Sequence, residues 1–212
     1  MTDDFETIQC FPTSIHVVKK PEFLKTVLPI VDEYIGKRKR EQGKTNDIYP
    51  VYMTDHLFED PRLEEFCSYI GGTAWNILRE QGYDMSRFST TFTEMWAQHH
   101  YKYSGMDQHV HPYGSQLVGF YFLRSPPNCS VATFFDPRPG KVQNSLPEHN
   151  FEAVTDAANA FHVMPEEGNL VFTNSWLPHA FTKNGSEDPM TFIHFNIAVT
   201  VNDEPVCDVE VI

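Results

Sequence analysis

The 212-residue sequence lacks the cysteine spacing of a disulfide-stabilised protein. Its four cysteines lie far apart and none belongs to a CxxC pair: Cys10, Cys67, Cys129 and Cys207. Sparse, unpaired cysteines favour a reducing compartment over a disulfide framework.

Long apolar runs are also absent. No stretch reaches the roughly 18 consecutive apolar residues of a membrane-spanning helix. The opening MTDDFETIQC has neither a basic region nor an apolar core, so it does not resemble a secretory signal. We therefore expect a cytoplasmic protein with no membrane partner.

Basic residues are few. The chain has 16 Lys and Arg against 29 Asp and Glu, which gives a formal net charge of −13 at pH 7. Phosphate groups would be repelled, so nucleic acid is not an expected partner, although GKRKR at residues 36–40 is a small basic run. A small molecule or a protein side chain remains as the expected substrate, and a homo-oligomer stays open.

The spacing of apolar residues changes near residue 88. Residues 20–84 place them at intervals of three and four, which is typical of helices. Pro29 predicts a kink or a break in the first helix, and Gly71–Gly72 an interruption in the second. Asp60 before a proline predicts a helix start, with the aspartate as its cap.

Later segments are short, rich in Phe, Tyr, Thr, Val and Ile, and separated by Pro, Gly, Asn and Asp. This pattern predicts many short strands forming a sandwich or barrel. We expect one domain over residues 1–212, mainly β with N-terminal helices. In it, about 1–87 form a helical support layer and about 88–212 an antiparallel double sheet.

Three ionisable side chains alternate in DQHVHPYGSQLVGFYFLR: Asp107, His109 and His111. Positions i, i+2 and i+4 of a strand share one face. Two imidazoles with one carboxylate suit Fe(II) and oxygen chemistry, and His179 in LVFTNSWLPH is the candidate ligand from a distant strand. A lone histidine is more often a surface or satisfied core residue. His99–His100 is a weaker ligand pair, because adjacent strand residues point to opposite faces.

These segments, together with FFDPRPG, MPEEGNLVF and FIHFNIAV, resemble the Fe(II)/2-oxoglutarate-dependent oxygenases between about Thr93 and Val199. They are most similar to a small bacterial and phage group with an H-x-H-P motif. The resemblance implies a double-stranded β-helix, a jelly-roll or cupin-like barrel, with Fe(II) held at its mouth by His109, His111 and His179. It also implies 2-oxoglutarate as co-substrate and a dioxygenase reaction that hydroxylates a substrate and releases succinate and CO₂. A phage-encoded member would act in the host cytoplasm.

The sequence departs from the wider superfamily at two places. His111 stands where relatives carry Asp or Glu, so Asp107 is an alternative ligand. Relatives also place an arginine, which grips the distal carboxylate of 2-oxoglutarate, where this chain has Met190. Arg124, at the end of the strand after H-x-H, is the expected replacement. Other candidates for the co-substrate are Gln98, Tyr121, His194 and Asn196.

Two alternative functions stay open at this point. A cupin-type three-histidine dioxygenase would use no 2-oxoglutarate, and H-x-H followed by Gln116 loosely resembles its motif. A non-enzymatic β-helix binding module would keep the histidines as structural residues. Asp136 and Arg138 in FFDPRPG are expected to shape a turn, and Trp96 and Trp176 to pack.

Overall fold

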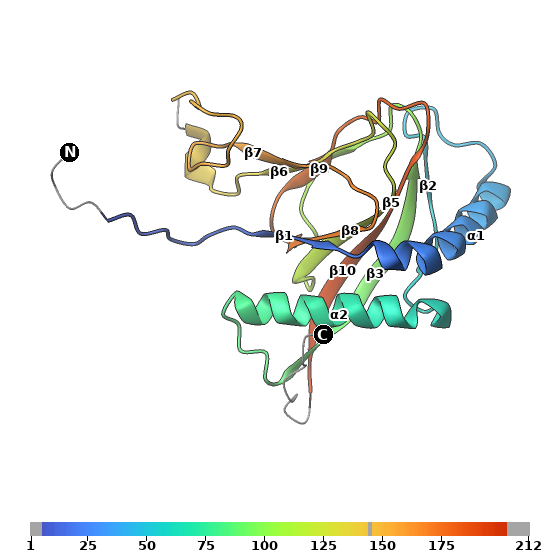
Figure 1. Cartoon of the computed structure of the whole chain (residues 1–212), viewed down its shortest axis with the longest axis horizontal. Helices are drawn as coiled ribbons and strands as arrows, with labels where there is room; N and C mark the ends of the chain where they lie inside the picture. Colours follow the sequence, from blue (N-terminus) through green and yellow to red (C-terminus); the bar gives the residue numbers. More distant parts are fainter. Residues whose placement is uncertain (1–5, 144–145, 203–212) are drawn as a thin grey trace.

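The computed structural model describes residues 6–143 and 146–202 (Figure 1); Cys207 and the two ends of the expected domain lie outside them. The helical elements are η1 (Pro21–Phe23), α1 (Leu24–Gln42), η2 (Pro61–Leu63), α2 (Glu64–Glu80) and η3 (Pro139–Gln143). The strands are β1 (Ile15–Lys19), β2 (Val51–Met53), β3 (Phe88–His100), β4 (Met106–His109), β5 (Leu117–Arg124), β6 (Ala132–Phe135), β7 (Ala160–Val163), β8 (Asn169–Asn174), β9 (His179–Phe181) and β10 (Met190–Val201).

Two antiparallel sheets make up the β part of the fold. The larger has the order β1-β8-β5-β10-β3-β2, and the smaller has the order β4-β9-β6-β7. Sequence neighbours such as β4 and β5 lie in different sheets, so the chain crosses between the sheets repeatedly. The predicted mainly β, double-stranded β-helix fold with N-terminal helices is confirmed.

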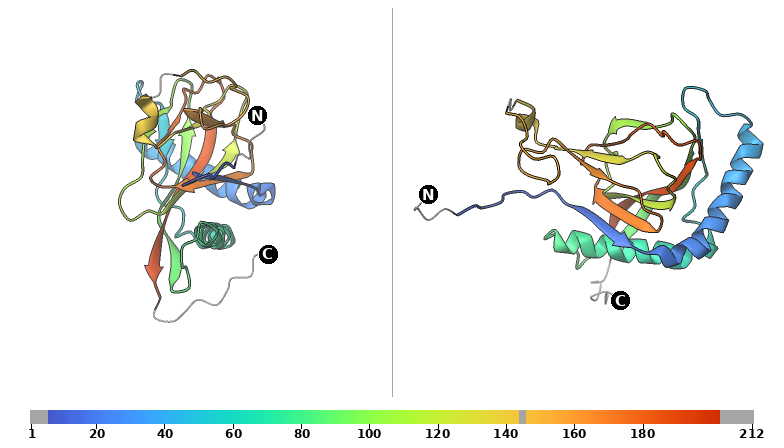
Figure 2. Two further views of the ribbon diagram at one scale, coloured as in Figure 1. Left: turned by 90° about the vertical axis from the view of Figure 1, so that its left-hand side faces the viewer. Right: turned by 45° about the horizontal axis from the view of Figure 1, so that its top comes forward.

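The two long helices lie against one face of the larger sheet (Figures 1 and 2). Apolar residues of the helices, such as Phe66 on α2, form one core with outward-facing residues of the sheet, such as Tyr121 and Phe195. The side chains inside the barrel form a second core, which includes Phe120, Phe134, Phe181 and Phe192. The metal-ligand candidates belong to this inner side.

The first 87 residues are not purely helical, so that expectation was wrong in part. β1 pairs with β8 and β2 pairs with β3, which makes them the two edges of the larger sheet. Both are short, and their partners are distant in sequence. Local periodicity therefore could not reveal them.

Neither predicted helix is broken. α1 runs through Pro29, and its ribbon bends along its length (Figure 2). α2 runs through Gly71 and Gly72. At Gly71 the helix approaches β3 closely. The Gly71 carbonyl accepts a hydrogen bond from the Thr90 hydroxyl at 2.9 Å, and a Cβ on residue 71 would lie only 3.3 Å from that hydroxyl oxygen. The glycine allows this close contact.

Asp60 caps a helix start, as predicted: its side chain accepts a hydrogen bond from the backbone N–H of Arg62. The start is that of η2, which leads directly into α2. Within the described residues, no helix is both long and apolar enough to cross a bilayer.

Candidate metal centre

Three histidines meet at one end of the barrel. His109 on β4 is the direct cross-strand partner of His179 on β9. His111 follows β4, and its backbone N–H donates to the carbonyl of Ser175 at 2.9 Å, which fixes the chain beside β9. One nitrogen from each ring lies within 4.8 Å of the others. The Nε2 atoms of His111 and His179 are 3.2 Å apart.

The separation of these two nitrogens fits a shared metal ion. It is less than twice the metal–imidazole bond length of about 2.1 Å, so one ion can contact both. The ring centroids of His109 and His111 are 5.2 Å apart, and each ring offers one nitrogen to the same group. The donor set of neutral imidazoles suits Fe(II) among other divalent metals.

Backbone carbonyls orient two of the rings. His109 Nδ1 contacts the carbonyl oxygen of Asp107 at 2.7 Å, and His179 Nδ1 contacts that of Leu177 at 2.9 Å. A carbonyl only accepts, so each Nδ1 carries the proton and each Nε2 presents a lone pair. Such contacts fix the tautomer that a metal requires.

The rings of His111 and His179 are kept neutral by their surroundings. Burial, together with the neighbouring His179 and His109, lowers the pKa of His111 to about 3. Burial also lowers the pKa of His179 to about 4, although its bond to Leu177 opposes the shift. Neutral imidazoles coordinate metals without first losing a proton.

The structure does not bring the Asp107 carboxylate to the metal centre. Met106 pairs with Phe181 and His109 with His179, so β4 carries one extra residue between these pairs. Such a β-bulge breaks the alternation of faces, and Asp107 is exposed. Its backbone carbonyl, not its carboxylate, contacts His109. The expectation that Asp107 shares the ligand face was wrong.

Arg124 is also outside the barrel interior. It pairs across the sheet with Thr191, whose hydroxyl contacts His99 on the side of the helices. A register shift between Thr191 and Phe192 produces this orientation. The guanidinium forms two 2.7 Å hydrogen bonds with the carboxylate of Asp32 on α1. Arg124 therefore ties the sheet to a helix.

Arg124→Ala is expected to leave the dissociation constant of 2-oxoglutarate within about threefold, a change below about 1 kcal/mol. Unfolding in urea should show a loss of at most about 1 kcal/mol, because the pair with Asp32 is partly exposed. Asp32→Ala is the matched control and should lose a similar amount of stability. If Arg124→Ala weakened the binding of 2-oxoglutarate more than tenfold and Asp32→Ala did not, Arg124 would be a co-substrate ligand after all.

Tyr121 likewise faces the helices. Its hydroxyl donates to the carbonyl of Lys20 at 2.8 Å, and its ring lies 5.0 Å from that of Phe66. Leu117, Tyr121 and Leu123 share this outer face of β5. The prediction that Tyr121 binds the co-substrate is therefore not supported by its position.

The other candidates for the co-substrate do point into the barrel. His194 stacks on His111 with ring centroids 5.0 Å apart, and neither of its ring nitrogens has a hydrogen-bond partner. Burial holds its pKa well below the ordinary value, so this ring too is neutral. Gln98 Oε1 contacts a nitrogen of His100 at 2.8 Å. Asn196 donates through Nδ2 to Glu94, and its Oδ1 has no partner.

One inward-facing residue was set aside by the sequence reasoning. His100 is fully buried and its Nδ1 has no partner. As a metal-ligand pair, His99–His100 is the weaker prediction because adjacent strand residues point to opposite faces. The same alternation places His100 on the face of Gln98, which was a named candidate.

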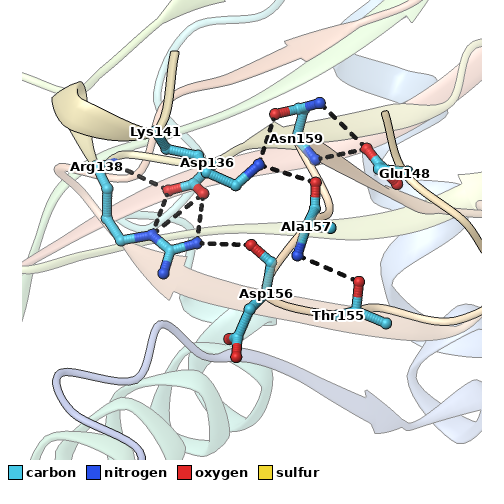
Figure 3. A network of polar contacts seen from close by, with 8 residues as sticks. All are labelled: Asp136, Arg138, Lys141, Glu148, Thr155, Asp156, Ala157 and Asn159. Atoms are coloured by element: carbon cyan, nitrogen blue, oxygen red, sulfur yellow. Dashed lines mark hydrogen bonds and ion pairs between the residues drawn. The ribbon is translucent and has the colours of Figure 1, made fainter. Parts of the chain in front are cut away.

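The FFDPRPG segment follows β6, whose Phe134 pairs with His179, and forms a turn held by polar contacts (Figure 3). Asp136 accepts hydrogen bonds from the side chain and backbone of Arg138. Lys141 donates to the carbonyl of Ala157 and to Asn159, which in turn donates to Glu148. This network joins η3 to the segment that leads into β7.

A cleft of about 840 Å³ lies between this turn and the extended segment before β1. Its lining includes Phe134 and Leu177 from the barrel wall and Asp136 and Arg138 from the turn. The ring of Phe134 also lies 5.9 Å from that of His179. One wall of the cleft is therefore in contact with the metal-ligand candidates.

A double-stranded β-helix with three converging imidazoles at one end is suited to the class of non-haem metal enzymes. The comparisons with known proteins agree. Residues 94–196 match the family model described as "Putative 2OG-Fe(II) oxygenase". This match and the neighbouring structures support a 2-oxoglutarate/Fe(II) oxygenase, with Fe(II) as cofactor and 2-oxoglutarate as co-substrate. The two alternative functions are not favoured by these findings.

Solved structures show the same fold at low sequence identity. AviO1 from Streptomyces viridochromogenes Tue57 superimposes with a TM-score of 0.60 and 13% identity, covering 88% of this chain and 90% of that chain. A prolyl-4-hydroxylase from Pseudomonas putida gives 0.58 and 9%, covering 88% and 92%. HygX from Streptomyces hygroscopicus, with nickel, 2-oxoglutarate and hygromycin B bound, gives 0.56 and 10%, covering 88% and 83%. Among curated proteins, none matches this sequence.

Proposed function

We propose that this protein is a hydroxylase in which His109, His111 and His179 bind the iron. The observation that carries the proposal is the convergence of three ring nitrogens within 4.8 Å of one another. Two of the three rings present Nε2 because a backbone carbonyl holds Nδ1. Iron and 2-oxoglutarate, when bound, supply the oxygen activation that releases succinate and CO₂ as the substrate is oxidised.

The protein's own residues shield and orient this centre. Phe120 and Phe134 lie 5.6 and 5.9 Å from the ring of His179, which is 1% exposed. These rings exclude water from the inner side of the metal, which protects a reactive centre from side reactions. We assign Gln98, His194 and Asn196 to the inner wall against which the co-substrate lies, because their side chains face the same interior.

We further propose that the substrate enters from the cleft beside Phe134 and Leu177. Apolar side chains close in sequence to the ligands are exposed: Val110, Tyr113 and Trp176 are 52%, 107% and 47% exposed. Exposed apolar groups around a site favour a ligand with an apolar part. Both a protein side chain and a small molecule can supply such an apolar part. The structural relatives include a prolyl hydroxylase and a protein bound to hygromycin B.

The test is an anaerobic titration of the metal-free protein with Fe(II) and then 2-oxoglutarate. A visible charge-transfer band that saturates at one equivalent of each is expected, because both must occupy one centre. On admission of oxygen, 2-oxoglutarate should be converted to succinate. Iron binding without the band would instead favour the cupin-type reaction, and no iron binding would favour the non-enzymatic module.

A further inference from the structure

The interior of the barrel has no ordinary cation for the second carboxylate of 2-oxoglutarate. Among the described residues, no Lys or Arg is buried. A carboxylate that leaves water needs a cation or several hydrogen-bond donors. On the proposed function, the interior must therefore supply such donors from uncharged side chains.

His100 lies on the strand beside the position at which the wider superfamily is expected to carry an arginine. That arginine corresponds to Met190, and Met190 is the direct cross-strand partner of His100. Met190 belongs to the core inside the barrel, as does Phe192, whose ring lies 5.2 Å from that of His100. A donor on His100 therefore reaches the same part of the interior from the neighbouring strand.

Only one of the two ring nitrogens of His100 has a hydrogen-bond partner. The ring is fully buried, its Nε2 contacts Gln98 Oε1 at 2.8 Å, and its Nδ1 has no partner. Buried polar atoms in native proteins are nearly always hydrogen-bonded, and an orphaned one requires an explanation. A ligand atom that completes the bond is such an explanation.

The other buried histidines are already engaged or lie elsewhere. His99 points toward the helices, where its two nitrogens contact Thr191 and Lys39. His179 belongs to the metal centre. His194 stacks directly on His111 and so lies at the metal end of the barrel. His100 lies two residues beyond Gln98 on the inner face of β3. It is therefore the remaining candidate to contact the far end of an elongated ligand.

We propose that Nδ1 of His100 donates a hydrogen bond to the distal carboxylate of 2-oxoglutarate, and that Gln98 holds the ring in place through Nε2. Gln98 can support this tautomer by turning its amide, so that its NH₂ group donates to Nε2 and the ring proton lies on Nδ1. The site would thus recognise the carboxylate with a neutral donor in place of a guanidinium.

Charge balance agrees with a neutral donor. Three neutral imidazoles around a divalent ion leave a charge of +2, which a bound dianion cancels. Relatives with a carboxylate ligand would carry one negative charge more, and their arginine offsets it. In this chain the missing carboxylate and the missing arginine compensate each other. Burial, with His99 as a smaller cause, lowers the pKa of His100 to about 3, which keeps the empty site uncharged.

The experiment compares two ligands on the iron-loaded protein without oxygen. 2-Oxoglutarate and 2-oxopentanoate share the metal-chelating end, but only the first has a distal carboxylate. Dissociation constants come from the charge-transfer band. His100→Phe should weaken 2-oxoglutarate about 10- to 100-fold, as for a lost hydrogen bond to a charged group. It should leave 2-oxopentanoate within about threefold.

Three further variants control for packing. His99→Phe makes the same change on the opposite face of β3 and should keep the preference for 2-oxoglutarate. His100→Asn, whose amide nitrogen can stand near the position of Nδ1, should recover most of that preference. If His100→Phe does not fold, His100→Leu replaces it and should show the same selective weakening of 2-oxoglutarate binding.

The possible outcomes separate the two proposals. A wild-type protein that gives no band with 2-oxoglutarate overturns the proposed function itself. A wild-type protein that binds, with a His100→Phe protein that binds 2-oxoglutarate equally well, overturns only the role of His100. Equal weakening of both ligands would also overturn it, since that result indicates a packing defect.

Discussion

Replacing His179 with alanine is expected to leave the protein without bound iron. Its ring is almost fully buried, and its Nε2 lies 3.2 Å from that of His111. Loss of a partner that only orients a metal ligand weakens metal binding by about 10- to 100-fold, so loss of the ligand itself should exceed about 100-fold. The measurement is metal analysis after anaerobic loading with Fe(II) and gel filtration. His111→Ala should give the same result.

Asp107→Ala is the informative comparison, because Asp107 precedes His109 by only two residues. Its carboxylate is exposed, and its backbone carbonyl, which contacts His109, survives the substitution. Iron affinity should therefore remain within about threefold, or about 0.7 kcal/mol. A second control is His162→Ala, on the exposed face of β7. If Asp107→Ala lost iron while His111→Ala kept it, the site would contain two histidines and a carboxylate, contrary to the assignment.

The contrast between His111 and Asp107 shows how far the sequence could predict the site. The order of motifs indicated the fold, the metal and three converging histidines, because these depend on residue types at fixed spacing. The face of each side chain depends on strict alternation, and one inserted residue inverts it. The bulge in β4 removed Asp107 from the site. No residue in DQHVHP predicts that bulge.

The same cause explains the misplaced Arg124. It was expected inside the barrel from its position after H-x-H, but the register shift opposite Thr191 turned it toward α1. Where β3 is regular over its last seven residues, alternation holds, and Gln98 and His100 share the inner face. The edge strands β1 and β2 were missed for another reason. Their partners lie far away in sequence, so pairing rather than local propensity creates them.

The buried histidines should also make the metal-free protein sensitive to acid. Burial lowers the pKa of His99 and His179 to about 4 and that of His100 to about 3, from an ordinary value of about 6.5. The unfolded chain therefore binds more protons than the folded chain below pH 6.5. Their contribution to stability is complete above pH 6.5 and is lost as the pH falls toward 4.

At pH 5 each of these three rings should lower the free energy of unfolding by about 2 kcal/mol relative to pH 7. The loss from each ring is a sizeable share of the entire stability of many domains, about 5 to 15 kcal/mol. We expect urea unfolding of the metal-free protein, followed by circular dichroism, to show this loss between pH 7 and pH 5. In the His99→Phe protein the loss should be smaller by about 2 kcal/mol, whereas His162→Phe, at an exposed position, should leave it unchanged. A metal-free wild-type protein equally stable at both pH values would contradict this prediction, because it would show that these rings are protonated as easily in the folded chain as in the unfolded one.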